Sequence, residues 1–336
     1  MLTHRNLCAA VRNIVSVMGL DESVVESVPM RLSHSFGFAR IRSVLEIGGT
    51  AILEDGFLRS ERLLNRMKTL EANALSAVPA GFAVLLDHFS EPFKKIGPRF
   101  RFIEIGSAPM SLRNKERLLE LCPNAGVFMH YGLTESSRAT FLNLRTEQDH
   151  WNTVGRPSPG IEIQIRDEHG NEAAPNMTGD ILIRGETTAA GYWGQREHTR
   201  SSFEEGWFRT GDLGFVDAKG YLTLAGRASE MINLGGIKVS PREVEEALLK
   251  QEGILEAAVV GVPAPDAVTG IVITAYLTVR RPDQFLDFEF LRRACLKELE
   301  AYKVPQEFEI VSSLPKTGAG KVRKDLLVCS KKNNHG

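Results

Sequence analysis

The pentapeptide from Tyr131 to Glu135, YGLTE, places an aromatic ring, a hydroxyl and a carboxylate close together. An aromatic ring can stack on a base, a hydroxyl can bind a phosphate oxygen, and a carboxylate can hold a divalent metal. The segment follows an expected strand, and open parallel sheets place their ligands at strand ends. An ordinary turn from strand to loop, carrying an exposed acid, fits the pentapeptide equally well.

Two further residues, Asp212 and Arg227, suit a sugar or phosphate ligand. Asp212 stands in an expected tight Thr-Gly-Asp turn, where its carboxylate could accept hydrogen bonds from two vicinal hydroxyls, such as those of a ribose. An aspartate that caps its own turn is the commoner case. Arg227 follows Gly226, and its rigid guanidinium suits a phosphate or a sugar. A salt bridge between domains is the commoner role of such an arginine.

Lys321 and His34 are candidates with strong alternatives. A mobile lysine in the loop around Lys321 could offset the charge that develops on a carboxylate and an α-phosphate during an in-line displacement, but a solvated basic tail fits too. The loop is not a P-loop, because Pro315 and Val322 stand where that motif requires glycine and Ser or Thr. His34, in SHSFG, could line a substrate pocket, although a lone histidine near aromatic residues is more often structural.

The elements that position these residues change in character along the chain. Up to about residue 141, helical and strand patterns alternate, which predicts a parallel sheet with helices on its faces. The patterns predict helices over 59–70, 82–89 and 111–122, and strands over 74–78, 101–105 and 127–130. Beyond residue 141, short strands and glycine-containing turns predict a small antiparallel unit that resembles a distorted barrel. Its strands are expected at 161–166, 180–184, 207–209, 213–216 and 221–225.

A third unit is expected to begin at Gly226. Ser240 as the N-cap, Pro241 at the first helical position and Glu243 in the place that closes a capping box together predict a helix to about residue 250. Strands over 257–262 and 271–279 and a helix over 288–301 follow. We therefore expect a small α+β domain at the C-terminal end, joined by a short hinge at 226–230.

Composition limits the class of protein. Lys and Arg number 41 against 42 Asp and Glu, which argues against nucleic acid or an anionic membrane as the main partner. No apolar run approaches the roughly 20 residues that span a bilayer, and the start MLTHRNL is not a secretory signal. The four cysteines are scattered and form no CxxC pair, as in a cytoplasmic protein with reduced thiols.

Taken in order, these segments resemble the adenylate-forming (AMP-binding) superfamily of acyl-CoA synthetases, nonribosomal adenylation domains and luciferases. The resemblance covers essentially the whole chain, through YGLTE, VGRPSPG, GYWG, GWFRTGDLG, GRASEMINLGGIKVSPREVE and PKTGAGKVRK. MLTHRNL, GWFRTGDLG and NLGGIKVSP are most similar to acyl-CoA synthetases and favour a fatty acid as substrate. The resemblance implies an α/β fold in which residues 1–140 are a remnant of the large AMP-binding domain and 141–225 its β subdomain. Residues 226–230 would form the hinge and 231–336 a mobile C-terminal domain.

The resemblance also implies a role for each candidate in binding ATP or AMP. Tyr131 would stack on the adenine, Thr134 would bind the α-phosphate, and Glu135 would hold Mg²⁺. Asp212 would bind the ribose hydroxyls, with Arg227 supporting the ribose or the phosphate. The backbone of Gly106-Ser107-Ala108-Pro109 would form the wall beside the adenine.

Four residues are implied in the remaining chemistry. Lys321 would be the lysine that promotes adenylation, and His34 would sit near the carboxylate of the acid. Gly235 and Gly236 would let the pantetheine of coenzyme A pass close to the backbone. In the reaction implied, the carboxylate attacks the α-phosphate of ATP and releases pyrophosphate, and the thiol then displaces AMP. The acid is ionised at pH 7, so the protein would supply positioning and charge neutralisation.

Two departures from the family qualify this expectation. Ser229 stands at the hinge position where the family usually has Asp or Lys. MLTHRNL resembles the segment just after the family's Ser/Thr/Gly-rich phosphate loop, and no such loop occurs in this sequence. We therefore expect a truncated synthetase with little ATP–pyrophosphate exchange by itself. Three explanations of the truncation are open: a late start in the gene model, a separate polypeptide that supplies the N-terminal subdomain, or gene decay. The alternatives are an acyl-AMP ligase that loads an acyl carrier protein and a non-catalytic remnant that binds nucleotide.

Overall fold

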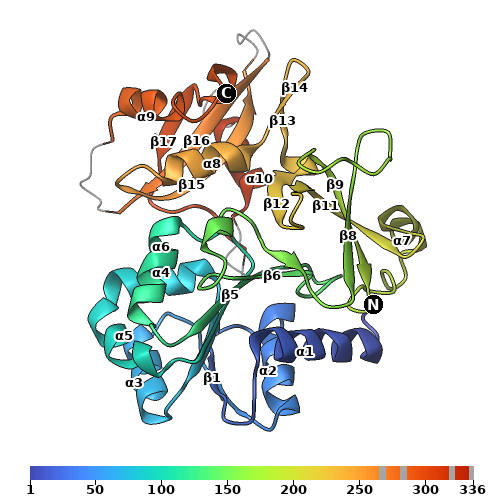
Figure 1. Cartoon of the computed structure of the whole chain (residues 1–336). Helices are drawn as coiled ribbons and strands as arrows, with labels where there is room; N and C mark the ends of the chain where they lie inside the picture. The colour runs from blue at the N-terminus through green and yellow to red at the C-terminus, as the bar shows by residue number, and fades with distance from the viewer. Residues whose placement is uncertain (265–269, 281–285, 318–321, 333–336) are drawn as a thin grey trace. The chain divides into compact units, whose positions relative to one another are not determined.

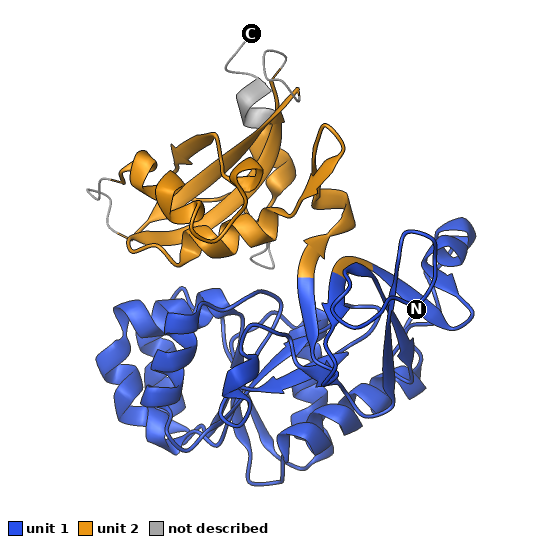
Figure 2. Cartoon of the chain, turned by 45° about the horizontal axis from the view of Figure 1, so that its top comes forward, with its two compact units in different colours: residues 1–210, 214–224 blue, residues 211–213, 225–336 orange. Residues whose placement is uncertain are grey.

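The structure is a computed structural model that describes residues 1–264, 270–280, 286–317 and 322–332. The chain forms two compact units, which Figure 2 shows in different colours. Unit 1 comprises residues 1–210 and 214–224, and unit 2 comprises residues 211–213 and 225–336. Each unit has its own hydrophobic core, and each is described separately below.

The centre of unit 1 is a seven-stranded sheet with the order β2-β1-β3-β4-β5-β6-β7. Its strands are β1 Val25–Val28, β2 Thr50–Leu53, β3 Ala74–Ala77, β4 Phe102–Ile105, β5 Gly126–Tyr131, β6 Thr140–Asn143 and β7 Arg156–Pro157. The first five strands pair in parallel, and β6 and β7 continue the sheet antiparallel. The predicted parallel sheet is confirmed.

Helices cover both faces of this sheet (Figure 1). They are α1 His4–Met18, α2 Ser35–Glu46, α3 Ser60–Thr69, α4 Pro79–His88, α5 Ser90–Ile96 and α6 Leu112–Leu121. Side chains of α3 to α6 pack with Leu75 and Ile103, while α1 and α2 pack with Ala74 and Phe102. Because neighbouring strand residues point to opposite faces, the two groups of helices lie on opposite faces.

An antiparallel sheet follows in the chain, with the order β10-β11-β9-β8 and with β12 paired to β11. Its elements are β8 Ile161–Arg166, β9 Gly179–Gly185, α7 Arg196–Ser202, β10 Phe203–Glu204, β11 Trp207–Val216 and β12 Leu222–Arg227. The prediction of a tight turn around Asp212 is wrong, because β11 continues through this residue as one strand. Gly211 has a φ of +72°, which glycine tolerates, so the strand absorbs a left-handed residue without ending.

Unit 2 contains the hairpin of β13 and β14 and a three-stranded sheet with the order β15-β16-β17. Its elements are β13 Ile232–Leu234, β14 Ile237–Val239, α8 Pro241–Leu249, β15 Ile254–Pro263, β16 Ile271–Val279, α9 Phe288–Cys295, β17 Glu307–Ile310 and α10 Lys324–Lys332. Short 3-10 helices lie at Gly97–Arg99, Gln148–His150, Ala228–Glu230 and Ala301–Lys303. The helix predicted over 288–301 ends earlier, at Cys295, where hydrogen bonds to the third residue back tighten the chain into turns.

The start of α8 matches the sequence in part. Ser240 is the N-cap, and its Oγ accepts a hydrogen bond from the Glu243 amide at 3.4 Å. The Glu243 carboxylate, which a capping box would turn back toward Ser240, pairs instead with Lys303 Nζ at 2.8 Å. Within the described part of the chain, no helix has the length and apolar character needed to cross a membrane.

Candidate functional site

The segment from Tyr131 to Glu135 lies at the carboxyl end of β5, as predicted. Tyr131 is the last residue of the strand and is 8% exposed, packed in a small hydrophobic core. Leu133 and Ser136 exchange backbone hydrogen bonds of 3.0 and 3.2 Å, which close a tight loop with exposed Thr134 inside it. A side chain at Gly132 would lie 2.6 Å from the Arg138 amide nitrogen, so the close approach of the loop requires glycine there.

Glu135 is oriented by Tyr192, a residue to which the sequence analysis gave no role. The Tyr192 hydroxyl donates a 2.8 Å hydrogen bond to Glu135 Oε1, and the Tyr192 ring stacks on His198 with centroids 4.4 Å apart. Burial, and then the bond to Glu135, raises the pKa of Tyr192 to about 12, so the phenol stays a donor at pH 7. Its position in the GYWG segment was the available signal.

A single carboxylate of this kind fits Mg²⁺ better than a metal that needs a protein cage. In the part of the chain that the structure describes, no three His, Cys, Asp or Glu side chains gather into a metal site. Mg²⁺ is commonly bound by one or two carboxylates together with substrate phosphates. Glu135, half-buried and held by Tyr192, is therefore a suitable protein ligand for a metal that also binds a phosphate.

The segment Gly106-Ser107-Ala108-Pro109 follows β4, directly beside the end of β5. Ile105 pairs with Met129, so the parallel register carries Gly106 alongside His130. A side chain at Gly106 would overlap with the His130 imidazole, and Ser107 adopts a φ of +73°. Gly106 is buried, while the next three residues are exposed. The structure thus brings this segment and Tyr131 to neighbouring positions at one sheet edge.

His34 lies apart from these contacts. His34 is the exposed N-cap residue of α2, and its side chain makes no capping hydrogen bond. Phe36, two residues further on, is buried. The prediction for Lys321 lies outside the described residues.

Unit 2 contains the other four candidates. Arg227 Nε lies 2.9 Å from Asp212 Oδ1. Asp212 is 7% exposed, whereas the Arg227 side chain is 41% exposed. The salt bridge considered for Arg227 therefore forms with the other candidate and within one unit. Gly235 and Gly236 form the exposed turn between β13 and β14 with φ of +61° and +103°, the conformation of a two-residue hairpin turn.

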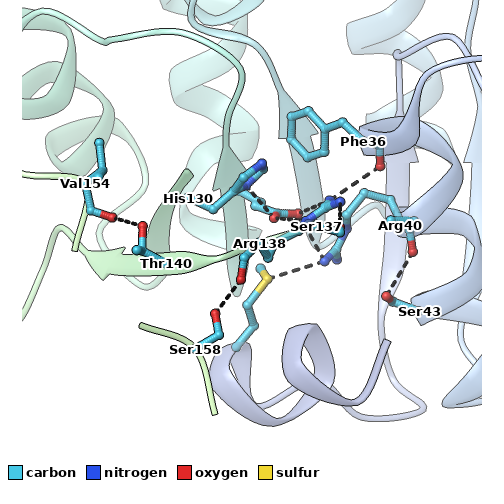
Figure 3. Close-up of polar contacts among 12 residues, drawn as sticks. Phe36, Arg40, Ser43, His130, Ser137, Arg138, Thr140, Val154 and Ser158 are labelled. Carbon is cyan, nitrogen blue, oxygen red and sulfur yellow. Dashed lines mark hydrogen bonds and ion pairs between the residues drawn. The ribbon is translucent and has the colours of Figure 1, made fainter. Parts of the chain in front are cut away.

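A buried cluster of charged side chains lies behind the strand ends of unit 1 and was missed by the sequence analysis (Figure 3). Arg40 Nη2 lies 2.6 Å from Glu26 Oε2, and Arg40 Nη1 lies 3.3 Å from Glu104 Oε2. Glu104 Oε1 also lies 2.7 Å from His130 Nδ1 and 3.0 Å from Arg138 Nε. The Glu104 carboxylate thus lies within 3.3 Å of nitrogen atoms of three side chains, Arg40, His130 and Arg138. A glutamate inside the short apolar strand FIEI was the available signal for this cluster.

Comparisons with known proteins agree with this arrangement. Residues 1–193 match the family model of the AMP-binding enzyme, and residues 243–321 match that of the AMP-binding enzyme C-terminal domain. The chain therefore belongs to the AMP-binding enzyme family. In line with the sequence analysis, it has the fold of the adenylate-forming enzymes, and its relatives are CoA ligases.

Two relatives and one solved structure illustrate the likeness. The chain is 34% identical to the sulfoacetate–CoA ligase of Cupriavidus necator over 96% of its own length and 62% of that protein. It is 35% identical to an oxalate–CoA ligase of Arabidopsis thaliana over 97% of its own length and 63% of that protein. The crystal structure of ATP-bound MatB from Rhodopseudomonas palustris superposes with a TM-score of 0.90 at 28% identity, covering 100% of this chain and 66% of that one. The chain thus spans about three fifths of the length of these two curated relatives.

Proposed function

We propose that this protein is an AMP-forming acid–thiol ligase, which converts a carboxylic acid, ATP and coenzyme A into acyl-CoA, AMP and pyrophosphate. Membership of the AMP-binding enzyme family supports the proposal. The observation that carries it is the tight loop of Thr134 and Glu135 at the end of β5. There a hydroxyl and an oriented carboxylate stand next to the backbone segment that begins at Gly106.

The candidate residues of both units are assigned to the nucleotide and its metal ion. Tyr131 and the backbone of Gly106-Ser107-Ala108-Pro109 contact the adenine, Thr134 donates to the α-phosphate, and Asp212 accepts hydrogen bonds from the ribose hydroxyls. Arg227, paired with Asp212, supports the ribose or the phosphate. Glu135 is the protein ligand of Mg²⁺, which when bound neutralises charge on the phosphates.

The remaining assignments concern the acid and the thiol. Lys321 offsets charge during adenylation, His34 lies near the acid's carboxylate, and Gly235 and Gly236 admit pantetheine past the exposed hairpin. We also propose residues 226–230 as the hinge of a mobile C-terminal domain that comprises 231–336. A fatty acid as the substrate stays a prediction from the sequence. A separate polypeptide that completes the enzyme also stays a proposal.

A thioester assay tests this function and separates it from its alternatives. The purified chain is given acetyl-adenylate or octanoyl-adenylate together with coenzyme A, or with a phosphopantetheinylated acyl carrier protein. Mass spectrometry then measures the thioester formed. We expect acyl-CoA to form at least about tenfold faster than without protein.

Each other result selects another function. Faster loading of the carrier protein would identify an acyl-AMP ligase. Nucleotide binding without acceleration of either thioester would identify a non-catalytic remnant. If the chain shows no nucleotide binding and accelerates no thioester formation, the proposal is contradicted.

A further inference from the structure

The buried cluster of unit 1 consists of Glu26, Arg40, Glu104, His130 and Arg138. Arg40, Glu26 and Glu104 are fully buried, and Arg138 is 2% exposed. Removing charges from water costs several kcal/mol for each ion, which the ion pairs must offset. Hydrophobic side chains would fill this space at lower cost, so a cluster this large calls for a further reason.

The charges of the cluster are unevenly shared. Arg40 has a carboxylate of its own, since its Nε and Nη2 both contact Glu26 at 2.8 and 2.6 Å. Arg138 has only Glu104, which it shares with Arg40 and His130. The other nitrogen contacts of Arg138 are neutral groups, the Ser137 hydroxyl at 3.2 Å and the Phe36 carbonyl at 3.4 Å. Arg138 is therefore the least neutralised cation of the cluster.

A further cation stands close to Arg138. Burial, and after it the positive charge of Arg138, lowers the pKa of Arg42. The Arg42 Nη1 atom is buried and has no hydrogen-bond partner among the described residues. Burial also lowers the pKa of His130, so its imidazole adds no positive charge at pH 7. With Arg42 included, this region holds three arginines against the two glutamates that pair with Arg40 and Arg138, which is an excess of one positive charge.

The cluster contacts Phe36, which follows closely after His34, the residue that the proposed function assigns to the acid. The Phe36 ring, two residues after His34, contacts the His130 ring at 4.7 Å and the Arg138 guanidinium at 4.8 Å (Figure 3). His130 backs onto Gly106. Arg138 belongs to the same loop as Thr134 and Glu135. Phe36 thus connects the position of His34 in the chain to the buried charges of the cluster.

In place of the fatty acid that the sequence favours, we propose that the protein selects a short acid whose far end carries a second anionic group, a carboxylate or a sulfonate, and that Arg138 binds this group. The inference rests on the proposed function, because it takes the acid to lie beside His34. When the acid binds, Glu104 keeps Arg40 and His130 as partners. The guanidinium of Arg138, which shares Glu104 with them, then pairs with the second anionic group of the acid. Charge-assisted bonds of this kind are the strong ones.

Stable analogues of the acyl-adenylate test the selection with the chain itself. Titration calorimetry compares sulfamoyladenosine with its succinyl, butanoyl and octanoyl derivatives. The succinyl and butanoyl groups both have four carbons, and they differ in that the succinyl group ends in a carboxylate. We expect the succinyl compound to bind at least about tenfold more tightly than the butanoyl compound, and the octanoyl compound to bind no better than the butanoyl one. Equal or tighter binding of the butanoyl or octanoyl compound would overturn the proposal.

Variants assign the effect to Arg138. Arg138→Met is expected to remove the preference for the succinyl compound and leave sulfamoyladenosine binding unchanged, while Arg138→Lys keeps most of the preference. Arg145→Met is the matched control, since Arg145 is a partly buried arginine that donates to the Ala125 and Cys122 carbonyls at 2.8 Å. A preference that survives Arg138→Met, or that Arg145→Met also removes, would overturn the role of Arg138.

The wild-type comparison does not depend on how well the variants fold. Sulfamoyladenosine distinguishes a failure of the proposed function from a failure of the acid selection, because it contains the nucleoside without an acyl group. If it fails to bind, the proposed function fails, and the acid selection fails with it. If it binds but the succinyl group adds nothing, the acid selection alone is wrong.

Discussion

His130 is surrounded by charged and aromatic side chains that come from distant parts of the chain. Glu104 lies on β4, Arg40 and Phe36 lie on α2, and Arg138 lies in the loop before β6. Burial alone would raise the pKa of Glu104, but Arg138, His130 and Arg40 hold it well below its usual value. The carboxylate is thus ionised throughout the physiological range, and the imidazole beside it is neutral.

The neutral state of His130 makes the stability of unit 1 depend on pH. Burial is the main cause that lowers the pKa of His130 in the folded protein, with Glu104 opposing it. In the unfolded chain the imidazole has an ordinary pKa of about 6.5. Below that pH the unfolded state binds more protons than the folded state, so stability is full above about 6.5 and falls as the pH falls.

We therefore expect wild-type protein to lose unfolding free energy between pH 7 and pH 5, and His130→Gln to lose less. Urea unfolding followed by tryptophan fluorescence measures this change for unit 1, which contains Trp151, Trp193 and Trp207. His150→Gln is the control, because His150 stacks on Tyr221 at 3.6 Å outside the cluster. The same pH dependence in wild type and His130→Gln would contradict the neutral buried imidazole.

The elements that carry the candidate site were largely predictable from local patterns. The strands Ile161–Arg166 and Ile271–Val279 have the predicted bounds, because alternating or apolar runs between turn residues identify strands locally. The buried cluster could not be predicted, since Glu104 receives its partners from residues that are distant in sequence. For the same reason the sequence could not show that Glu243 pairs with Lys303 instead of closing a capping box.

Helix capping gives a prediction at the scale of single elements. Ser240→Ala removes an acceptor for the Glu243 amide and is expected to cost α8 about 1 kcal/mol, or about fivefold in the opening of its first turn. Amide hydrogen exchange measures this opening. Ser111→Ala is the matched variant, since Ser111 Oγ caps α6 by accepting from the Asn114 amide at 3.3 Å. Each variant should speed exchange in its own helix, and a uniform change in both helices would contradict local capping.

The whole molecule combines two units with separate cores and separate candidate residues. Unit 1 carries Tyr131, Thr134 and Glu135, and unit 2 carries Asp212 and Arg227. Residues 1–193 and 243–321 match two family models of the AMP-binding enzymes. We propose for the whole chain that it binds an adenine nucleotide through the residues assigned above.

Calorimetric titration with AMP measures this binding in the wild type, in Asp212→Asn and in the control Asp180→Asn. Asp180 is a half-exposed aspartate on β9, 3.9 Å from Arg209, and has no assigned role. We expect the wild type and Asp180→Asn to bind AMP alike, and Asp212→Asn to bind about tenfold more weakly, because an amide cannot replace a carboxylate that accepts from two hydroxyls. Absence of AMP binding by the wild type, or equal affinity of Asp212→Asn, would contradict this proposal.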